Sequence, residues 1–164
     1  MNFNIHTNMI YLQDSKITIT NSKDVAKVFV DLLSLEDKID QDKEHFYVMH
    51  LDCRNRVNLV ELVSLGTLDS SLVHPRETFR RAIMQGSASI LVAHNHPSGE
   101  VDPSDADTNT TKKLLDAGEL LGISMQDHII FTKDKFYSFR NCREEKITGE
   151  ENSNMQLQKK GGEN

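Results

Sequence analysis

The residues with the clearest potential for chemistry lie in one stretch, HNHPSGEVDPSDAD, which occupies residues 94–107. It follows the apolar run ASILVA, which is typical of a strand buried on both faces. Side chains two residues apart on a strand point to the same face, so His94 and His96 converge if the strand continues between them. Pro97 favours that extended backbone. With Asp107 in the next helix, two imidazoles and a carboxylate form a three-ligand set suited to catalytic Zn²⁺, which leaves one position open for water.

The same residues also have a structural interpretation. A histidine at a strand end is often a structural residue, and Ser104 with Asp107 forms the S-x-x-D pattern of a helix capping box. Acidic side chains also favour the first turn of a helix electrostatically. Capping does not require His-x-His before a Pro- and Gly-rich loop, so the combination favours a metal site while the cap remains an alternative.

The elements that position these residues are expected to alternate between helix and strand. We expect a first helix from Asn21 or Ser22 to Leu33, an irregular connector at 34–45, and a strand hairpin formed by 44–52 and 56–66. A helix at 75–85, a strand at 88–93 and a helix at 104–121 follow, and Leu114, Leu115 and Leu121 give the last helix an apolar side. Two short strands are expected at 127–132 and 135–140. This order predicts an α/β fold with a mixed β-sheet flanked by helices. We expect residues 1–21 to form a leader or edge strand, 22–142 the domain, and 143–164 a disordered polar tail.

Composition excludes several classes of protein. The net charge is −6 and the sequence contains no Trp, which argues against a generally basic, aromatic nucleic-acid-binding surface. Two distant cysteines, Cys53 and Cys142, indicate neither a disulfide framework nor a Cys-rich zinc module. No signal peptide or membrane-spanning segment is evident, so we expect a cytoplasmic protein without a membrane partner.

The pattern H-x-H-P-x6-S-x2-D resembles the signature of the JAB/MPN metalloprotease (JAMM) family, and its spelling HNHPSG is similar to the RadC-like branch. The blocks EHFYVMHLD, SLGTLDSSLVHPRETFRRA and GISMQDHIIF resemble the flanks of that motif. The resemblance implies a three-layer, cytidine-deaminase-like α/β sandwich. It also implies zinc held by His94, His96 and Asp107, Ser104 as a donor to the oxyanion, and Glu44 as general base. Glu61 remains the competing base.

The resemblance implies hydrolysis of peptide or isopeptide bonds by a zinc-activated water. The alternative is a non-enzymatic DNA-repair or genome-maintenance module that retains a metal site. Larger RadC-like proteins carry an N-terminal helix-hairpin-helix region that could contact DNA. The stretch before Glu44 has one expected helix and no glycine, which does not match that region. We therefore expect a short form, and no direct nucleic-acid binding by this chain alone. The sequence lacks the H-x-E and P-C-x-x-C ligands of zinc deaminases, and its consecutive H-N-H letters differ from the dispersed residues of HNH nucleases. The substrate and the oligomeric state stay open.

Other histidines and a basic stretch carry weaker expectations. His128 follows the site helix and is expected either in the core or as a hydrogen-bond partner of a ligand histidine. His74 is expected at a helix start, and His45 and His50 in structural or exposed positions. The basic stretch Arg76, Arg80 and Arg81 is expected to form a solvated helix face, with an acidic partner as the alternative.

Overall fold

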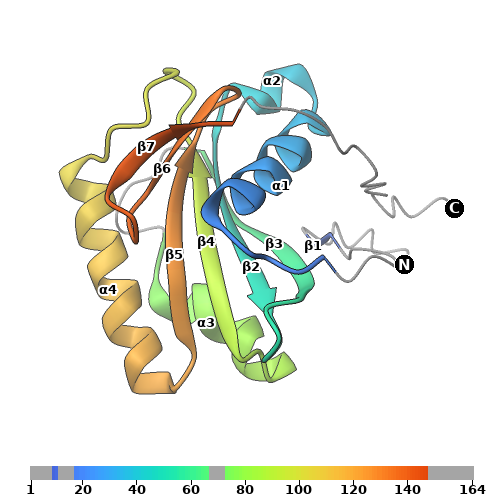
Figure 1. The fold of residues 1–164 in the computed structure, drawn as a ribbon, viewed down its shortest axis with the longest axis vertical. Helices are drawn as coiled ribbons and strands as arrows, with labels where there is room; N and C mark the ends of the chain where they lie inside the picture. Colours follow the sequence, from blue (N-terminus) through green and yellow to red (C-terminus); the bar gives the residue numbers. More distant parts are fainter. Residues whose placement is uncertain (1–8, 11–16, 67–72, 148–164) are drawn as a thin grey trace, which may run out of the picture.

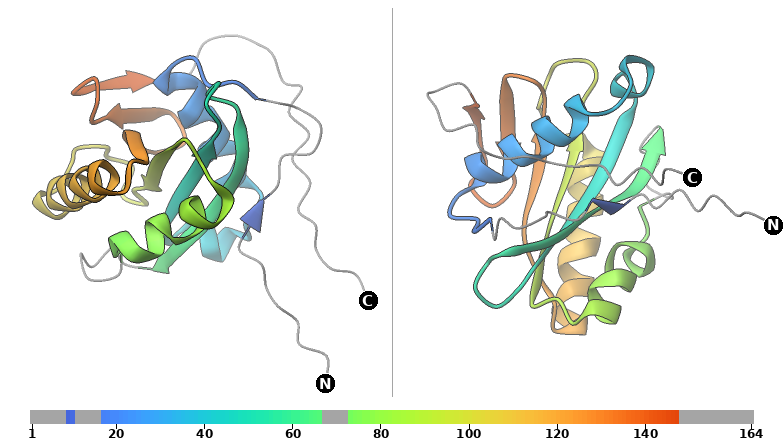
Figure 2. Two further views of the ribbon diagram at one scale, coloured as in Figure 1. Left: turned by 90° about the horizontal axis from the view of Figure 1, so that it is seen from below. Right: turned by 90° about the vertical axis from the view of Figure 1, so that its right-hand side faces the viewer.

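The computed structural model describes residues 9–10, 17–66 and 73–147, which form three layers with a central sheet (Figure 1). The elements in chain order are β1 (Met9–Ile10), α1 (Ser22–Ser34), α2 (Lys38–Gln41), β2 (Glu44–Leu51), β3 (Val57–Gly66), α3 (Pro75–Gln85), β4 (Ser89–Asn95), α4 (Asp105–Leu121), β5 (Ser124–Phe131), β6 (Lys135–Ser138) and β7 (Arg143–Lys146). Helix α1 covers one face of the sheet, and α3 and α4 cover the other (Figure 2). The predicted α/β sandwich with a mixed sheet is confirmed.

The sheet has the strand order β1-β3-β2-β4-β5-β6-β7. Only β4 and β5 are parallel neighbours; the other pairs are antiparallel. Helix α4 makes the crossover that a parallel pair requires. Strand β4 lies in the middle of this order, and its antiparallel pairing with β2 brings Phe46 opposite His94.

The core consists of two apolar clusters on opposite faces of the sheet. Under α1, the rings of Phe29, Tyr47 and Phe131 lie together, with Phe29 centred 5.6 Å from Tyr47 and 5.9 Å from Phe131. On the other face, Phe46 and Phe79 pack between the sheet and helices α3 and α4. Every residue of β4 is buried, which explains its near-continuous apolar sequence.

Local sequence signals define the ends of the helices. The side chains of Asn21 and Ser104 cap α1 and α4, and His74 caps α3 directly before Pro75. Gly86 and Gly122 end α3 and α4 in the left-handed conformation, with φ of 65° and 68°. These three helices confirm the predicted ones to within a residue at each end.

Three local predictions are wrong. The connector, predicted to be irregular, contains the short helix α2, and the side chain of Gln41 in this helix donates to the carbonyl of Glu36. The predicted tail begins as strand β7, because Arg143–Lys146 pair with β6. Its charged side chains follow no apolar alternation and are typical of a protected sheet edge. Of the apolar side expected on α4, only Leu114 is buried; Leu115 and Leu121 are 47% and 44% exposed.

Residues 148–164, the rest of the predicted tail, lie outside the described residues, as does most of the predicted leader. Within that leader, β1 pairs with β3 at the edge of the sheet, as the edge-strand alternative predicted.

Candidate metal centre

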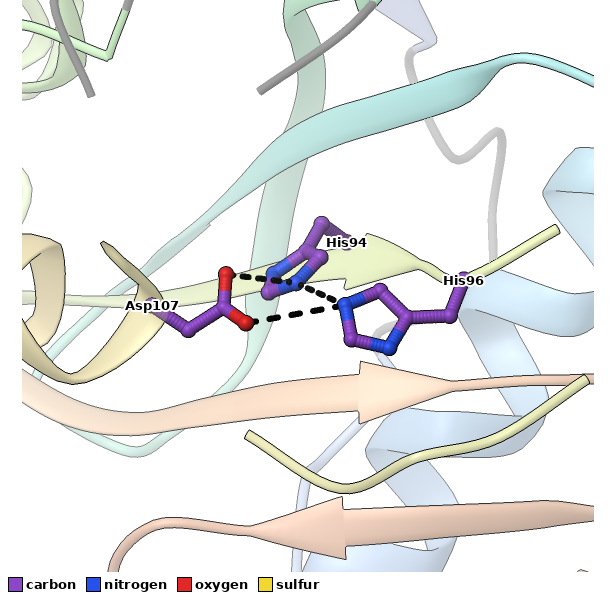
Figure 3. A group of neighbouring side chains, drawn as sticks. All are labelled: His94, His96 and Asp107. Atoms are coloured by element: carbon purple, nitrogen blue, oxygen red, sulfur yellow. Dashed lines mark hydrogen bonds and ion pairs between the residues drawn. The ribbon is translucent and has the colours of Figure 1, made fainter. Parts of the chain in front are cut away.

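Three predicted ligand residues meet at the end of β4. Nε2 of His94 lies 3.0 Å from Nε2 of His96 and 3.2 Å from Oδ1 of Asp107. Nε2 of His96 lies 3.6 Å from Oδ2 of Asp107. Figure 3 shows the carboxylate facing both imidazoles, with its two oxygens directed at different rings. Within the described residues, these side chains form the one group of at least three His, Cys, Asp or Glu residues arranged to hold a metal ion.

The backbone explains why the two histidines converge. Strand β4 ends at Asn95, and the amide of His96 still donates to the carbonyl of Phe131 on β5, so the extended conformation continues between the imidazoles. Asp107 reaches them from the first turn of α4, on the face of the sheet that this helix covers. The predicted convergence of strand end and helix start is therefore what the structure contains.

Hydrogen bonding leaves a lone pair of His96 directed at the cluster. Its Nδ1 lies 2.8 Å from the backbone carbonyl of Glu100. A carbonyl oxygen can only accept, so Nδ1 carries the hydrogen and Nε2 of the neutral ring is a free electron-pair donor. The loop that supplies this carbonyl is fixed by the buried Val101 and by a turn in which Gly99 donates to the carbonyl of His96.

The charges around the cluster favour a cation. Burial lowers the pKa of His94, against the opposing effect of Asp107. Burial also disfavours the charged form of His96, but the adjacent Asp107 carboxylate and the hydrogen bond to the Glu100 carbonyl outweigh burial and raise its pKa. Burial raises the pKa of Asp107, yet the two adjacent imidazoles and the hydrogen bond from Ser104 hold it far below its usual value. An ionised carboxylate and two imidazoles thus surround one point, and a metal ion satisfies all three.

Ser104 is hydrogen-bonded to the carboxylate of Asp107. Its Oγ donates to Oδ2 of Asp107 at 2.6 Å, and its backbone amide donates to the same oxygen at 2.8 Å. In return, the amide of Asp107 donates to Oγ of Ser104, so the capping box is complete. The structural and metal interpretations are therefore compatible, because the cap holds the carboxylate in place. The oxyanion role of Ser104 stays a prediction.

Glu44 and Glu61 lie in different surroundings. Glu44 begins β2 and lies two residues from Phe46, which pairs with His94, so strand alternation directs Glu44 to the face that carries His94. Its negative charge opposes the lowering of the His94 pKa by burial and adds to the effects that raise the pKa of His96. Glu61 instead lies with Oε2 3.5 Å from Nε2 of His50 and Oε1 3.3 Å from Nε of Arg81. The surroundings favour Glu44 as the base, and that role stays a prediction.

No sequence signal predicts a role for Asn95, the residue between the two histidines. Its side-chain oxygen accepts from the amide of His45 at 2.7 Å, and its Nδ2 donates to the carbonyl of Lys43 at 2.9 Å. These two backbone groups flank Glu44 on both sides. Through these two hydrogen bonds Asn95, which is 2% exposed, holds the start of β2 beside the end of β4. Only the strand register, which places these residues together, makes this role visible.

The other predicted residues have the following places. His128 contacts His94, with its Nε2 2.8 Å from Nδ1 of His94, which decides between the two expectations. His45 and His50 are both fully buried. Arg76 and Arg80 are exposed and pair with Glu77, whereas Arg81 turns inward to Glu61. Cys53 and Cys142 are exposed and free.

No helix within the described ranges combines the length and apolar character needed to cross a bilayer.

Comparison with known families agrees with this geometry. The family model of the RadC-like JAB domain matches residues 19–146. The chain belongs to this family. The match begins before α1 and ends with β7, so this RadC-like JAB domain includes the last strand of the sheet.

Relatives of this RadC-like chain carry the name UPF0758 protein, which states no activity. One from Chlorobium chlorochromatii (strain CaD3) is 50% identical over 101 residues, covering 62% of this chain and 46% of the relative. One from Staphylococcus epidermidis is 45% identical over 123 residues, covering 75% and 52%. One from Chlorobaculum parvum is 40% identical over 139 residues, covering 85% and 60%. The chain thus spans about half the length of the curated relatives it matches.

Proposed function

We propose that this RadC-like JAB domain is a zinc-dependent hydrolase of the JAMM type that cleaves peptide or isopeptide amide bonds. The spacing of the three ligand atoms carries the proposal. Tetrahedral zinc with bonds of about 2.0–2.1 Å separates its ligand atoms by about 3.3 Å. The two imidazole nitrogens lie 3.0 Å apart, and each lies near a different oxygen of Asp107, at 3.2 Å from His94 and 3.6 Å from His96. One ligand atom from each residue lies within 4.8 Å of the other two, so a modest movement of the carboxylate brings the three to zinc.

The residues around the cluster supply the rest of the chemistry. When bound, zinc polarises a carbonyl group and brings the pKa of a coordinated water to about 7. Glu44 accepts a proton from the attacking water and returns it to the leaving amine nitrogen. Ser104 turns its hydroxyl from Asp107 to the carbonyl oxygen of the substrate, where negative charge develops. The RadC-like resemblance supports both roles, and the position of Glu44 on β2 supports the first. Cytoplasmic localisation and a peptide or isopeptide partner belong to the same proposal.

The first experiment measures bound metal. The purified protein is loaded with zinc, dialysed and analysed for metal content, together with His96→Ala and Asp107→Ala. His74→Ala is the matched control, because His74 is exposed and caps α3, a helix that contributes no residue to the cluster. We expect one zinc ion per chain in the wild type and the control, and loss of zinc in the other two variants. Unchanged zinc content in all four proteins contradicts the site.

A second experiment separates the hydrolase from a DNA-associated accessory module. The zinc-loaded protein and Glu44→Gln are incubated with a peptide and isopeptide library and, separately, with duplex DNA at several salt concentrations. We expect cleavage that requires zinc and is lost in Glu44→Gln, and no DNA binding by this chain, whose net charge is −6. Salt-dependent DNA binding without any cleavage favours the accessory module.

A further inference from the structure

A line of hydrogen bonds connects the metal cluster to helix α4 through the interior. Nδ1 of His94 lies 2.8 Å from Nε2 of His128, on the neighbouring strand β5. Nδ1 of His128 lies 2.6 Å from Oγ1 of Thr111 on α4. Oγ1 of Thr111 in turn donates to the backbone carbonyl of Asp107 at 2.7 Å. The line therefore begins at one ligand residue and ends at another.

The direction of each hydrogen bond follows from its last acceptor. The Asp107 carbonyl can only accept, so the single hydroxyl proton of Thr111 is used there. Oγ1 of Thr111 is then left to accept from His128, whose Nδ1 must carry a hydrogen. His128 is 1% exposed, which favours the neutral ring, so its Nε2 has a lone pair and accepts from Nδ1–H of His94. The remaining nitrogen of His94, Nε2, is left without a hydrogen and faces the cluster.

The surroundings of His128 hold its ring in this orientation. The ring stacks on Phe139 with centroids 4.9 Å apart and meets the edge of Phe46 at 5.8 Å. Its backbone carbonyl accepts from the amide of Phe139. The pairing of β4 with β5 places His128 beside Val92, two residues before His94, so the contact is set by the sheet register.

We propose that Thr111 and His128 are positioning residues that fix His94 in the tautomer whose Nε2 can bind a metal ion. The inference rests on the proposed metal site, and it adds that Thr111 and His128 set the tautomer of His94 in the metal-free protein. Without the Thr111 hydroxyl, the hydrogen of His128 is free to occupy either nitrogen. When it occupies Nε2, it faces Nδ1 of His94 and forces the hydrogen of His94 onto the nitrogen that should bind the ion. Partners of ligand histidines typically contribute about 10–100-fold to metal affinity.

The test uses three substitutions on one helix. Thr111→Val removes the hydroxyl and keeps the shape, Thr111→Ser restores a hydroxyl, and Thr110→Val is the matched control, since Thr110 is a similarly buried neighbour. Zinc affinity is measured by competition with a chelator, and folding by thermal denaturation. We expect zinc binding about 10–100-fold weaker in Thr111→Val, near wild type in Thr111→Ser, and unchanged in Thr110→Val. Equal affinities of Thr111→Val and Thr110→Val overturn the proposal.

A spectroscopic measurement decides the question without zinc or activity. Long-range ¹H–¹⁵N NMR spectra of the metal-free protein at pH 8 report which nitrogen of each histidine carries the hydrogen. We expect Nδ1–H for both His94 and His128 in the wild type and in Thr111→Ser, and a mixed or reversed pattern in Thr111→Val. An Nε2–H tautomer of either ring in the wild type overturns the proposal. Because this reading is independent of hydrolysis, absence of peptidase activity contradicts the proposed function alone.

Discussion

Glutamate substitutions on two paired strands test which carboxylate acts as the base. Glu44 and Glu61 lie on β2 and β3, and each is replaced by Gln. Glu61 interacts with His50, which is fully buried, and with Arg81, whose side chain is 26% exposed. Breaking a buried pair costs about 3–5 kcal/mol; because water reaches Arg81, we expect about 2 kcal/mol for Glu61→Gln. For a chain of this size that corresponds to a Tm lower by about 4–8 °C.

The pH dependence of that loss has a defined sign. Burial raises the pKa of Glu61, but the adjacent His50 ring and Arg81 guanidinium outweigh burial and lower it below the model-compound value of 4.5. The folded state therefore favours the ionised carboxylate, and its stabilisation is present above pH 4.5 and lost as the pH falls through the folded pKa. The stability difference between wild type and Glu61→Gln should shrink below that pH.

The assays are thermal denaturation, zinc content and cleavage of whichever substrate the library identifies. We expect Glu61→Gln to be less stable but to keep zinc and activity at a temperature where it is folded. We expect Glu44→Gln to keep zinc and lose turnover. The reasoning is refuted if Glu44→Gln remains active and a folded, zinc-loaded Glu61→Gln does not.

Three further predictions concern stability and positioning. Gly118→Ala should lower the Tm, because the added Cβ lies 2.6 Å from the backbone oxygen of Ile123. This clash outweighs the gain of about 1 kcal/mol that the change usually gives in a helix. A higher Tm contradicts the prediction. Asn95→Ala should keep zinc but lower turnover, because it frees the backbone on both sides of Glu44; unchanged kcat contradicts this. Burial lowers the pKa of His94 and His128, so unfolding takes up protons below the unfolded value of 6.5. The metal-free protein should therefore lose up to about 1 kcal/mol for each of these two histidines between pH 6.5 and 5.5. His96, whose pKa is raised, offsets part of this loss. Urea denaturation with equal midpoints at both pH values contradicts the prediction.

The sequence predicts the grouping of the three candidate metal ligands because their spacing reflects local backbone geometry. His94 and His96 depend on strand alternation, and Asp107 depends on a helix cap, both of which a short stretch of sequence encodes. The proposed base differs, since Glu44 has no local signal and enters only through the family resemblance. Its closeness to the cluster depends on the pairing of β2 with β4, which joins residues far apart in the chain.

The supporting residues could not be predicted for the same reason. Asn95 and Thr111 have ordinary local interpretations, as a strand-end polar residue and a helix residue. Their partners come from β2 and β5, and only the register of the sheet brings them into contact. Strand β7 was missed because an edge strand of charged residues carries no hydrophobic period, although Ile147 after it is buried in the α1 cluster.

X-ray absorption spectroscopy at the zinc edge of the loaded protein tests the central claim most directly. We expect one ion per chain with two imidazole ligands and oxygen ligands, at about 2.0–2.1 Å, and loss of this spectrum in Asp107→Ala. A zinc ion without imidazole scattering, or an unchanged spectrum in Asp107→Ala, contradicts a metal centre formed by His94, His96 and Asp107.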